Sequence, residues 1–166
     1  MNFPYWLNLR DHLLMTADAE AGQKRFLDAV GRFHHQVGVA GEEFPLLANL
    51  TVLENTTLMR MYHENESRRR AFEAVQPSVQ ALDMEGALTR RDGQLSRVQR
   101  LKAFVLRSAA KGNIIHLLDG PRISDVQTTL QAVESLPNPM RLWVLCLAGD
   151  ASMYQGFGLR RIDVEA

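Results

Sequence analysis

Short, uninterrupted apolar runs alternate with helical patterns along this chain, and this alternation constrains the fold more than any other feature. The runs cover residues 12–16, 36–40, 113–118 and 140–148, and residues 159–164 have the pattern of an edge strand. A strand that is apolar at every position is buried on both faces, which is typical of parallel sheets with helices on either side. The sequence therefore predicts an α/β fold in which helices cover both faces of a mostly parallel sheet.

The segments between these runs have helical signals. Thr51 and Glu54 have the spacing of a capping box, which marks the start of a helix. The expected helices cover residues 22–34, 51–63, 66–75 and 96–110, and a further helix starts at a second capping box formed by Ser124 and Gln127. Pro77 either ends the third of these helices or bends its continuation. Residues 46–93 contain no strand pattern and are polar and loop-like over 83–93, so we expect a helical subdomain there, attached to a core of residues 1–45 and 94–166.

Composition excludes several classes of function. The 166 residues have the length of one domain, and a net charge of zero gives no electrostatic basis for binding nucleic acid. Apolar stretches are too short for a membrane-spanning helix, and Cys146, the single cysteine, excludes an internal disulfide. The first residues lack the pattern of a signal peptide. We expect Tyr5 and Trp6 to pack against the sheet, with contact to a membrane surface or partner as the alternative. His34 and His35 diverge on a helix without a third ligand, so no metal site is expected.

Two blocks of sequence carry a resemblance to a known family. Residues 45–55 read PLLANLTVLEN, and residues 95–121 read LSRVQRLKAFVLRSAAKGNIIHLLDGP. In this order they resemble two parts of ABC-transporter ATPases, namely the segment after the glutamine loop and the signature helix followed by the Walker B strand. The first block, with MRMYHEN behind it, most resembles the ATPases of bacterial MCE-type lipid-trafficking transporters. The resemblance covers about residues 7–165. It implies a RecA-like P-loop core from which the N-terminal antiparallel β subdomain is largely missing.

The phosphate loop of that family is altered in this chain. Gly22 keeps its residue type, but Gln23 stands at the position of the lysine and Lys24 at that of the magnesium-binding hydroxyl. Asp18 and Glu20 place carboxylates where the triphosphate binds in the family. Two like charges at roughly 4 Å repel by about 4 kcal/mol at an effective dielectric of about 20. A register shift that brings Lys24 to the lysine position is one alternative, and an ordinary helix start with favourable acidic residues is the other.

The later motifs of the family are altered in the same way. The positions concerned are Glu42 in the glutamine loop, Ser96 and Arg97 in the signature, Asp119 and Gly120 at Walker B, and Gly149 at the switch histidine. Only Ser96 and Asp119 match the family. Arg97 blocks the close approach that glycine allows, and Gly120 replaces the glutamate that polarises the attacking water. We expect Asp119 to be a strand-end residue bonded to local amides, and His116 to be a core histidine.

Residues 45–93 resemble the family most closely in sequence, and in that family this region binds the permease. The resemblance implies partner contacts at Phe44, Leu46, Leu47, Leu53, Met59 and Tyr62. For each of them, burial within the helical subdomain is the alternative.

Together these features imply a pseudo-ATPase, without ATP hydrolysis or a cofactor. It is expected to act through protein–protein contacts as an accessory or regulatory subunit of a membrane ABC transporter, with lipid as the candidate substrate. Its partner would be the transporter permease or an active ABC ATPase subunit, in the cytoplasm or on the inner face of the bacterial inner membrane. Two alternatives stay open: a nucleotide sensor that uses Lys24 and Arg97 without hydrolysis, and a free-standing homodimeric scaffold.

Overall fold

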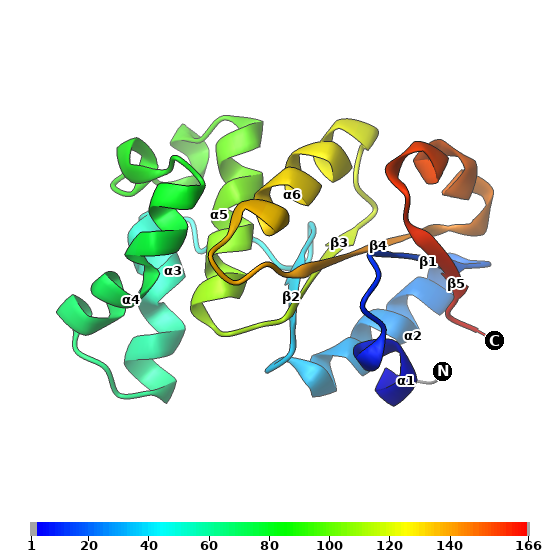
Figure 1. The fold of residues 1–166 in the computed structure, drawn as a ribbon, viewed down its shortest axis with the longest axis horizontal. Coiled ribbons are helices and arrows are strands. Elements are labelled where there is room, and N and C mark those ends of the chain that lie inside the picture. Colours follow the sequence, from blue (N-terminus) through cyan, green and yellow to red (C-terminus); the bar gives the residue numbers. More distant parts are fainter. Residues whose placement is uncertain (1–2, 166) are drawn as a thin grey trace.

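The strands form one parallel sheet, as the apolar runs predict. The computed structural model describes residues 3–165, apart from the side chain of His63. Its strands are β1 (Leu13–Ala17), β2 (Val37–Ala40), β3 (Ile115–Asp119), β4 (Arg141–Leu147) and β5 (Arg160–Asp163). They lie in the order β2-β3-β4-β1-β5, and every neighbouring pair is parallel (Figure 1). The predicted α/β fold is therefore confirmed, and β5 is an edge strand as expected.

Burial on both faces explains why the central strands are apolar. All five residues of β1 are buried. Trp143 of β4 is level with Leu13 of β1 on one side and with Leu117 of β3 on the other, and all three side chains are fully buried. Burying one such side chain contributes about 1.5–3 kcal/mol. The two central strands therefore carry much of the hydrophobic stabilisation, whereas β5 exposes both of its arginines.

Helices α1 (Phe3–Asn8) and α2 (Glu20–Val30) cover one face of the sheet (Figure 1). Aromatic rings join them to the turn that follows α2. The ring centroid of Phe3 lies 5.2 Å from that of Trp6, 5.1 Å from that of Phe26 and 5.0 Å from that of Phe33. Trp6 is buried, as expected, whereas Tyr5 is half exposed.

The opposite face is covered by a second layer of helices. These are α3 (Val52–His63), α4 (Arg68–Ala81), α5 (Arg97–Ala110) and α6 (Ile123–Ser135). Helices α5 and α6 lie against the sheet, and α3 and α4 stack beyond α5 (Figure 1). Val52, Val79 and Met84 from the helical segment belong to the same buried cluster as Leu106 of α5 and Leu118 of β3. The helical segment of residues 46–93 is therefore continuous in its packing with the core of the sheet.

The capping box at the start of α3 is confirmed. The amide of Glu54 donates to Thr51 Oγ1 at 3.2 Å, and the amide of Thr51 donates to Glu54 Oε2 at 2.9 Å. The second box, expected at Ser124 and Gln127, is wrong. Helix α6 begins at Ile123, because the carboxylate of Asp125 accepts the amide of Arg122 at 3.1 Å and so places the N-cap two residues earlier, at Arg122.

Helix α4 is longer than the sequence predicts. It continues through Pro77 to Ala81, although a proline inside a helix removes one hydrogen bond and crowds the preceding turn. Val75 and Val79, on either side of Pro77, are both buried. Their burial offsets the cost of the proline, so of the two outcomes expected at Pro77 the helix continues and does not end near residue 75.

Short 3₁₀ segments connect the main elements. They are η1 (Gly31–Phe33), η2 (Glu85–Ala87), η3 (Asp92–Gln94) and η4 (Ala148–Phe157). Segment η1 takes over where α2 ends at Val30, earlier than the expected residue 34. Segments η2 and η3 lie within the expected loop of residues 83–93. Among residues 3–165, the helices are too short or too polar to cross a membrane.

Candidate functional site

The turn between β1 and α2 corresponds to the phosphate loop of the resemblance. Only Asp18 and Ala19 separate the end of β1 from Glu20, the first residue of α2. The amides of Gly22 and Gln23 both donate to the carbonyl of Ala19, at 2.9 and 3.2 Å. A phosphate cradle presents such amides to its ligand. Here the helix starts early and uses both of them itself.

The space in front of this turn is filled by the Glu165 carboxylate, which follows β5. Glu165 Oε2 accepts the amide of Asp18 at 3.2 Å, and Oε1 is bonded to Arg25 Nη2. A Cβ atom added to Gly22 would lie 2.8 Å from Glu165 Oε1. These residues do not fit a triphosphate at Gly22. Sequence reasoning missed Glu165, because no local pattern joins residues 147 positions apart.

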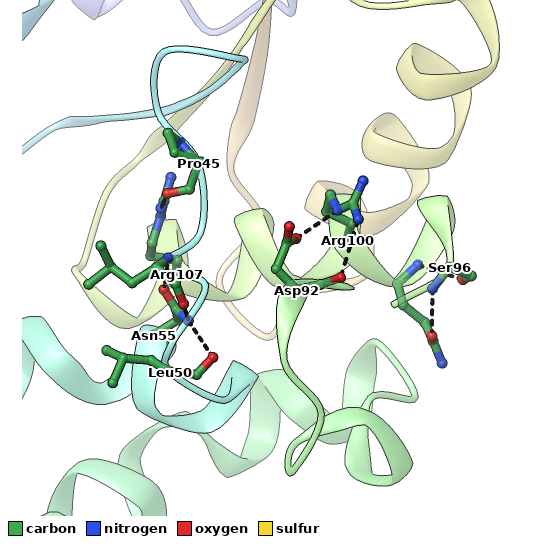
Figure 2. Close-up of polar contacts among 9 residues, drawn as sticks. Pro45, Leu50, Asn55, Asp92, Ser96, Arg100 and Arg107 are labelled. Atoms are coloured by element: carbon green, nitrogen blue, oxygen red, sulfur yellow. Dashed lines mark hydrogen bonds and ion pairs between the residues drawn. The ribbon is translucent and has the colours of Figure 1, made fainter. Parts of the chain in front are cut away.

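The signature position is occupied by contacts within the chain. Ser96 caps α5: its hydroxyl accepts the amide of Gln99 at 3.2 Å, and its amide donates to Gln99 Oε1 at 3.0 Å (Figure 2). Arg97 binds the carboxylate of Asp125 with two nitrogens, one at 2.6 Å and the other in a closer contact. The Arg97 hydrogen bond lowers the pKa of Asp125, and Asp125 raises the pKa of Arg97. Arg97 is therefore already paired with a carboxylate of the same chain, that of Asp125.

Carboxylates gather where β2 and β3 end. A pocket of about 350 Å³ is lined there by Glu42, Asp92, Arg97, Arg100, Asp119 and Asp125, among others. Arg100 is bonded to Asp92, with Nε 2.7 Å from Oδ1 (Figure 2), and Arg97 is bonded to Asp125. Both arginines are therefore neutralised, whereas Glu42 and Asp119 keep unpaired carboxylates within the described chain. Burial raises the pKa of Asp119, and Glu43 and Glu42 raise it further.

The expected bonds from local amides to the Asp119 carboxylate are not formed among the described residues. Its Cβ instead lies 3.0 Å from the place of a Cβ on Gly41. Across residues 3–165, no cluster of three or more His, Cys, Asp or Glu side chains is arranged to hold a metal ion.

The two glycines at catalytic positions differ in conformation. Gly120, which the resemblance aligns with the Walker B glutamate, has φ +54°, and its amide donates to the carbonyl of Leu145 at 3.0 Å. A glutamate would be strained in this left-handed conformation. Gly149, in place of the switch histidine, is exposed near the start of η4.

Comparison with solved structures identifies the fold. A structure of a transporter described as of the metal-chelate ABC type, in an inward-facing conformation, matches with a TM-score of 0.62 and 16% identity over 85% of this chain. This chain has the fold of an ABC-transporter ATPase domain. It spans 64% of the length of that relative, less than two thirds.

Two further structures with this fold match over more of their length. An ATP-binding cassette of an ABC transporter in its ADP conformation matches with a TM-score of 0.60 and 13% identity, over 93% of this chain and 72% of that chain. A dimeric post-hydrolysis state of an ATP-binding cassette bound to ADP and Pi matches with a TM-score of 0.59 and 16% identity, over 94% of this chain and 82% of that chain. Neither a family model nor a curated protein matches the sequence.

A second hollow of this ABC-ATPase fold lies at the edge of the sheet beside β2. We call it the apolar groove; it has a volume of about 420 Å³ and is lined by Leu27, Val30, Val39, Phe44, Leu47, Met59, Arg107 and Lys111, among others. Three of the six expected partner-binding residues, Phe44, Leu47 and Met59, therefore line one groove. The other three do not: Leu46 is buried, Leu53 lines a separate hollow, and Tyr62 is 79% exposed near the end of α3.

Two polar side chains shape the wall of the apolar groove (Figure 2). Arg107 of α5 donates to the carbonyls of Val39, Phe44 and Pro45 at 3.1, 2.9 and 2.8 Å. Its pKa is lowered by burial, and no carboxylate pairs with it among the described residues. Asn55 is buried at the start of α3 and bonds to the backbone of Leu47, Leu50 and Thr51. Sequence reasoning missed both, because each acts on a loop whose backbone course only the folded chain defines.

A polar contact beneath the groove joins α5 to the sheet. Ser108 Oγ lies 2.9 Å from Nδ1 of His116, which is fully buried, as expected of a core histidine. Gly38 is level with His116 on the neighbouring strand, and a Cβ atom there would lie 2.1 Å from Ser108 Oγ. Glycine is therefore required for α5 to come this close. Burial, with a smaller effect of Arg107, lowers the pKa of His116 to about 3.

Proposed function

We propose that this chain is a non-catalytic ABC-ATPase-like protein, an accessory or regulatory subunit of a membrane ABC transporter, with lipid as the candidate cargo. The observation that carries the proposal is a contrast between two places in one fold. Glu165 fills the remnant phosphate turn, whereas the apolar groove remains open and apolar. Such a subunit would act by contact with the permease at the inner face of the bacterial inner membrane.

The proposed lack of ATP hydrolysis rests on several positions at once. In the phosphate loop, Gln23 stands at the position of the lysine and Lys24 at the position of the magnesium-binding hydroxyl. Gly120 supplies no carboxylate to activate water. The sensor alternative needs a free Arg97, but Arg97 is paired with Asp125. Phosphoryl transfer depends on positioning and charge stabilisation, and the residues that would provide both are replaced.

The purified protein is expected to release no inorganic phosphate from ATP and magnesium above a blank without protein. The double variant Gln23→Lys/Gly120→Glu is expected to stay inactive too, because Glu165 still fills the turn and φ at position 120 is unsuited to glutamate. A colorimetric phosphate assay across gel-filtration fractions measures this. Phosphate release that co-elutes with the wild-type protein contradicts the proposal, and heat from ATP in a calorimetric titration supports the sensor instead.

The proposed partner surface is the apolar groove. Phe44, Leu47 and Met59 come from a loop and a helix that Arg107 and Asn55 hold in place, so the surface is preformed. A preformed groove binds with a smaller loss of conformational freedom than a mobile one. A volume of about 420 Å³ accommodates a few side chains of a partner segment.

Leu47→Asp is expected to lower capture by the permease of an MCE-type lipid transporter by about tenfold or more, since burying a leucine contributes about 1.5–3 kcal/mol and tenfold equals about 1.4 kcal/mol. Co-purification in detergent, quantified against wild type, measures it. Val98→Asp is the matched control, because Leu47 and Val98 are both 48% exposed but Val98 is on α5 outside the groove.

Equal losses in the two variants, or no capture of wild type beyond an unrelated protein, count against the groove. A dimeric solution mass by light scattering without permease would favour the homodimeric scaffold instead.

A further inference from the structure

Helix α2 begins without a side-chain cap. Its N-cap residue is Ala19, whose side chain cannot accept a hydrogen bond from the first turn. The amides at a helix start have no partners within the helix, and the helix dipole adds partial positive charge there. The start of this eleven-residue helix therefore favours a negative charge nearby.

Glu165 places a carboxylate beside this helix start from the end of the neighbouring strand β5. Its carboxylate joins the amide of Asp18 and the guanidinium of Arg25, and its own amide donates to Asp163 Oδ1 at 2.8 Å. Glu165 is exposed as a residue, as are Asp18 and Glu20, but only 26% of its side chain is accessible because the carboxylate lies against the turn. An anion is thus present at the turn, and it belongs to the chain.

We propose that Glu165 is a tethered anion that occupies the phosphate position of this fold and excludes small oxyanions from it. The contact also explains the one glycine that the remnant loop retains. A Cβ atom on residue 22 would lie 2.8 Å from Oε1 and 2.9 Å from Cδ of Glu165. Gly22 therefore lets the chain's own carboxylate lie this close to the helix, and no nucleotide is needed to explain it.

A tethered group competes strongly with a free one. Its effective concentration is on the order of millimolar or higher when the linker matches the span, and β5 holds Glu165 next to β1 through parallel pairing that ends at Asp163. Free phosphate at ordinary cellular concentration has to displace it. Removing the carboxylate should free the amide of Asp18 and the guanidinium of Arg25 at this helix start, which favours an oxyanion.

The test is a titration of inorganic phosphate into ¹⁵N-labelled protein, followed at the amide resonance of Asp18. Glu165→Ala is expected to bind phosphate saturably and at least about tenfold more tightly than wild type, as loss of a tethered competitor requires. Glu165→Gln keeps the shape of the side chain, removes its charge and covers the case in which the alanine variant folds poorly. Glu20→Gln is the matched control, because it removes one charge from the same turn without touching Glu165, and its phosphate affinity is expected to equal that of wild type.

Three results would overturn the inference. They are equal phosphate affinity in wild type and both Glu165 variants, a gain in Glu20→Gln as large as that in Glu165→Ala, and an Asp18 amide that neither Glu165 substitution shifts. The inference goes beyond the proposed transporter role and is distinguishable from it. Glu165→Ala should still be captured by the permease. A failed phosphate titration would therefore contradict the anion site alone, and a failed capture would contradict the groove alone.

Discussion

Replacing Asn55 with aspartate is expected to lower the free energy of unfolding by about 4 kcal/mol. The buried amide of Asn55 donates to the carbonyls of Leu47, Leu50 and Thr51 at 3.1, 3.3 and 3.0 Å, and its oxygen accepts the amide of Leu47 at 2.8 Å (Figure 2). An aspartate keeps the acceptor but loses every donor. It also turns a negative charge toward three carbonyl oxygens, so the loop that carries Leu47 would loosen.

Urea unfolding followed by circular dichroism measures the effect of Asn55→Asp. Asn55→Ala should be destabilised by a similar amount, about 3–4 kcal/mol, since each unpaired buried group costs about 1–3 kcal/mol. Asn49→Asp is the control: it makes the same chemical change on the same loop at an exposed position, and a surface substitution of this kind stays within about 0.5 kcal/mol. Similar midpoints for all three variants and wild type would show that Asn55 does not hold the loop.

Lowering the pH from 6.5 to 5 is expected to remove about 2 kcal/mol of stability through His116 alone. The pKa of this histidine is about 3 in the folded protein, against an ordinary value of 6.5. Between these values the unfolded chain binds a proton that the folded chain excludes. The stabilisation is therefore complete above pH 6.5 and is lost at about 1.4 kcal/mol per pH unit as the pH falls toward 3.

The pH dependence of unfolding in urea measures this contribution. The double variant His116→Leu/Ser108→Ala removes the titrating group together with the hydroxyl that would lose its partner, and its stability should fall less steeply with acid than that of wild type. His34→Gln, at an exposed position, should keep the wild-type slope. If the double variant has the wild-type slope as well, His116 is not held neutral by burial.

The order of the strands in sequence, and their burial on both faces, followed from local patterns. Residues 142–148 are apolar throughout because β4 lies between two neighbouring strands and under helices on either side, so every position after Arg141 is selected for burial. The start of α3 was also predictable, because Thr51 and Glu54 are three residues apart and need nothing else to form their box. Signals of this kind are contained within one turn or one strand.

Predictions failed where the deciding contact came from another element. Asp125 moved the start of α6 away from Ser124, and Arg97 of α5 holds Asp125 in that place. Of the two outcomes that the sequence left open at Pro77, α4 continues, because burial of Val75 and Val79 outweighs the lost hydrogen bond. Local propensity is a weak effect, and tertiary packing overrides it.

The same distinction between local patterns and contacts with other elements applies to the candidate site. The sequence by itself predicts which nucleotide-handling residue types are replaced, at Gln23, Lys24 and Gly120, because chemistry depends on residue type at a given position. Only the tertiary structure decided what occupies the space they leave. Glu165 reaches Gly22 because β5 pairs with β1, and Arg107 reaches three loop carbonyls because α5 packs against β2. Contacts between residues so far apart in the chain exist only after the backbone has folded, and no spacing along the sequence records them.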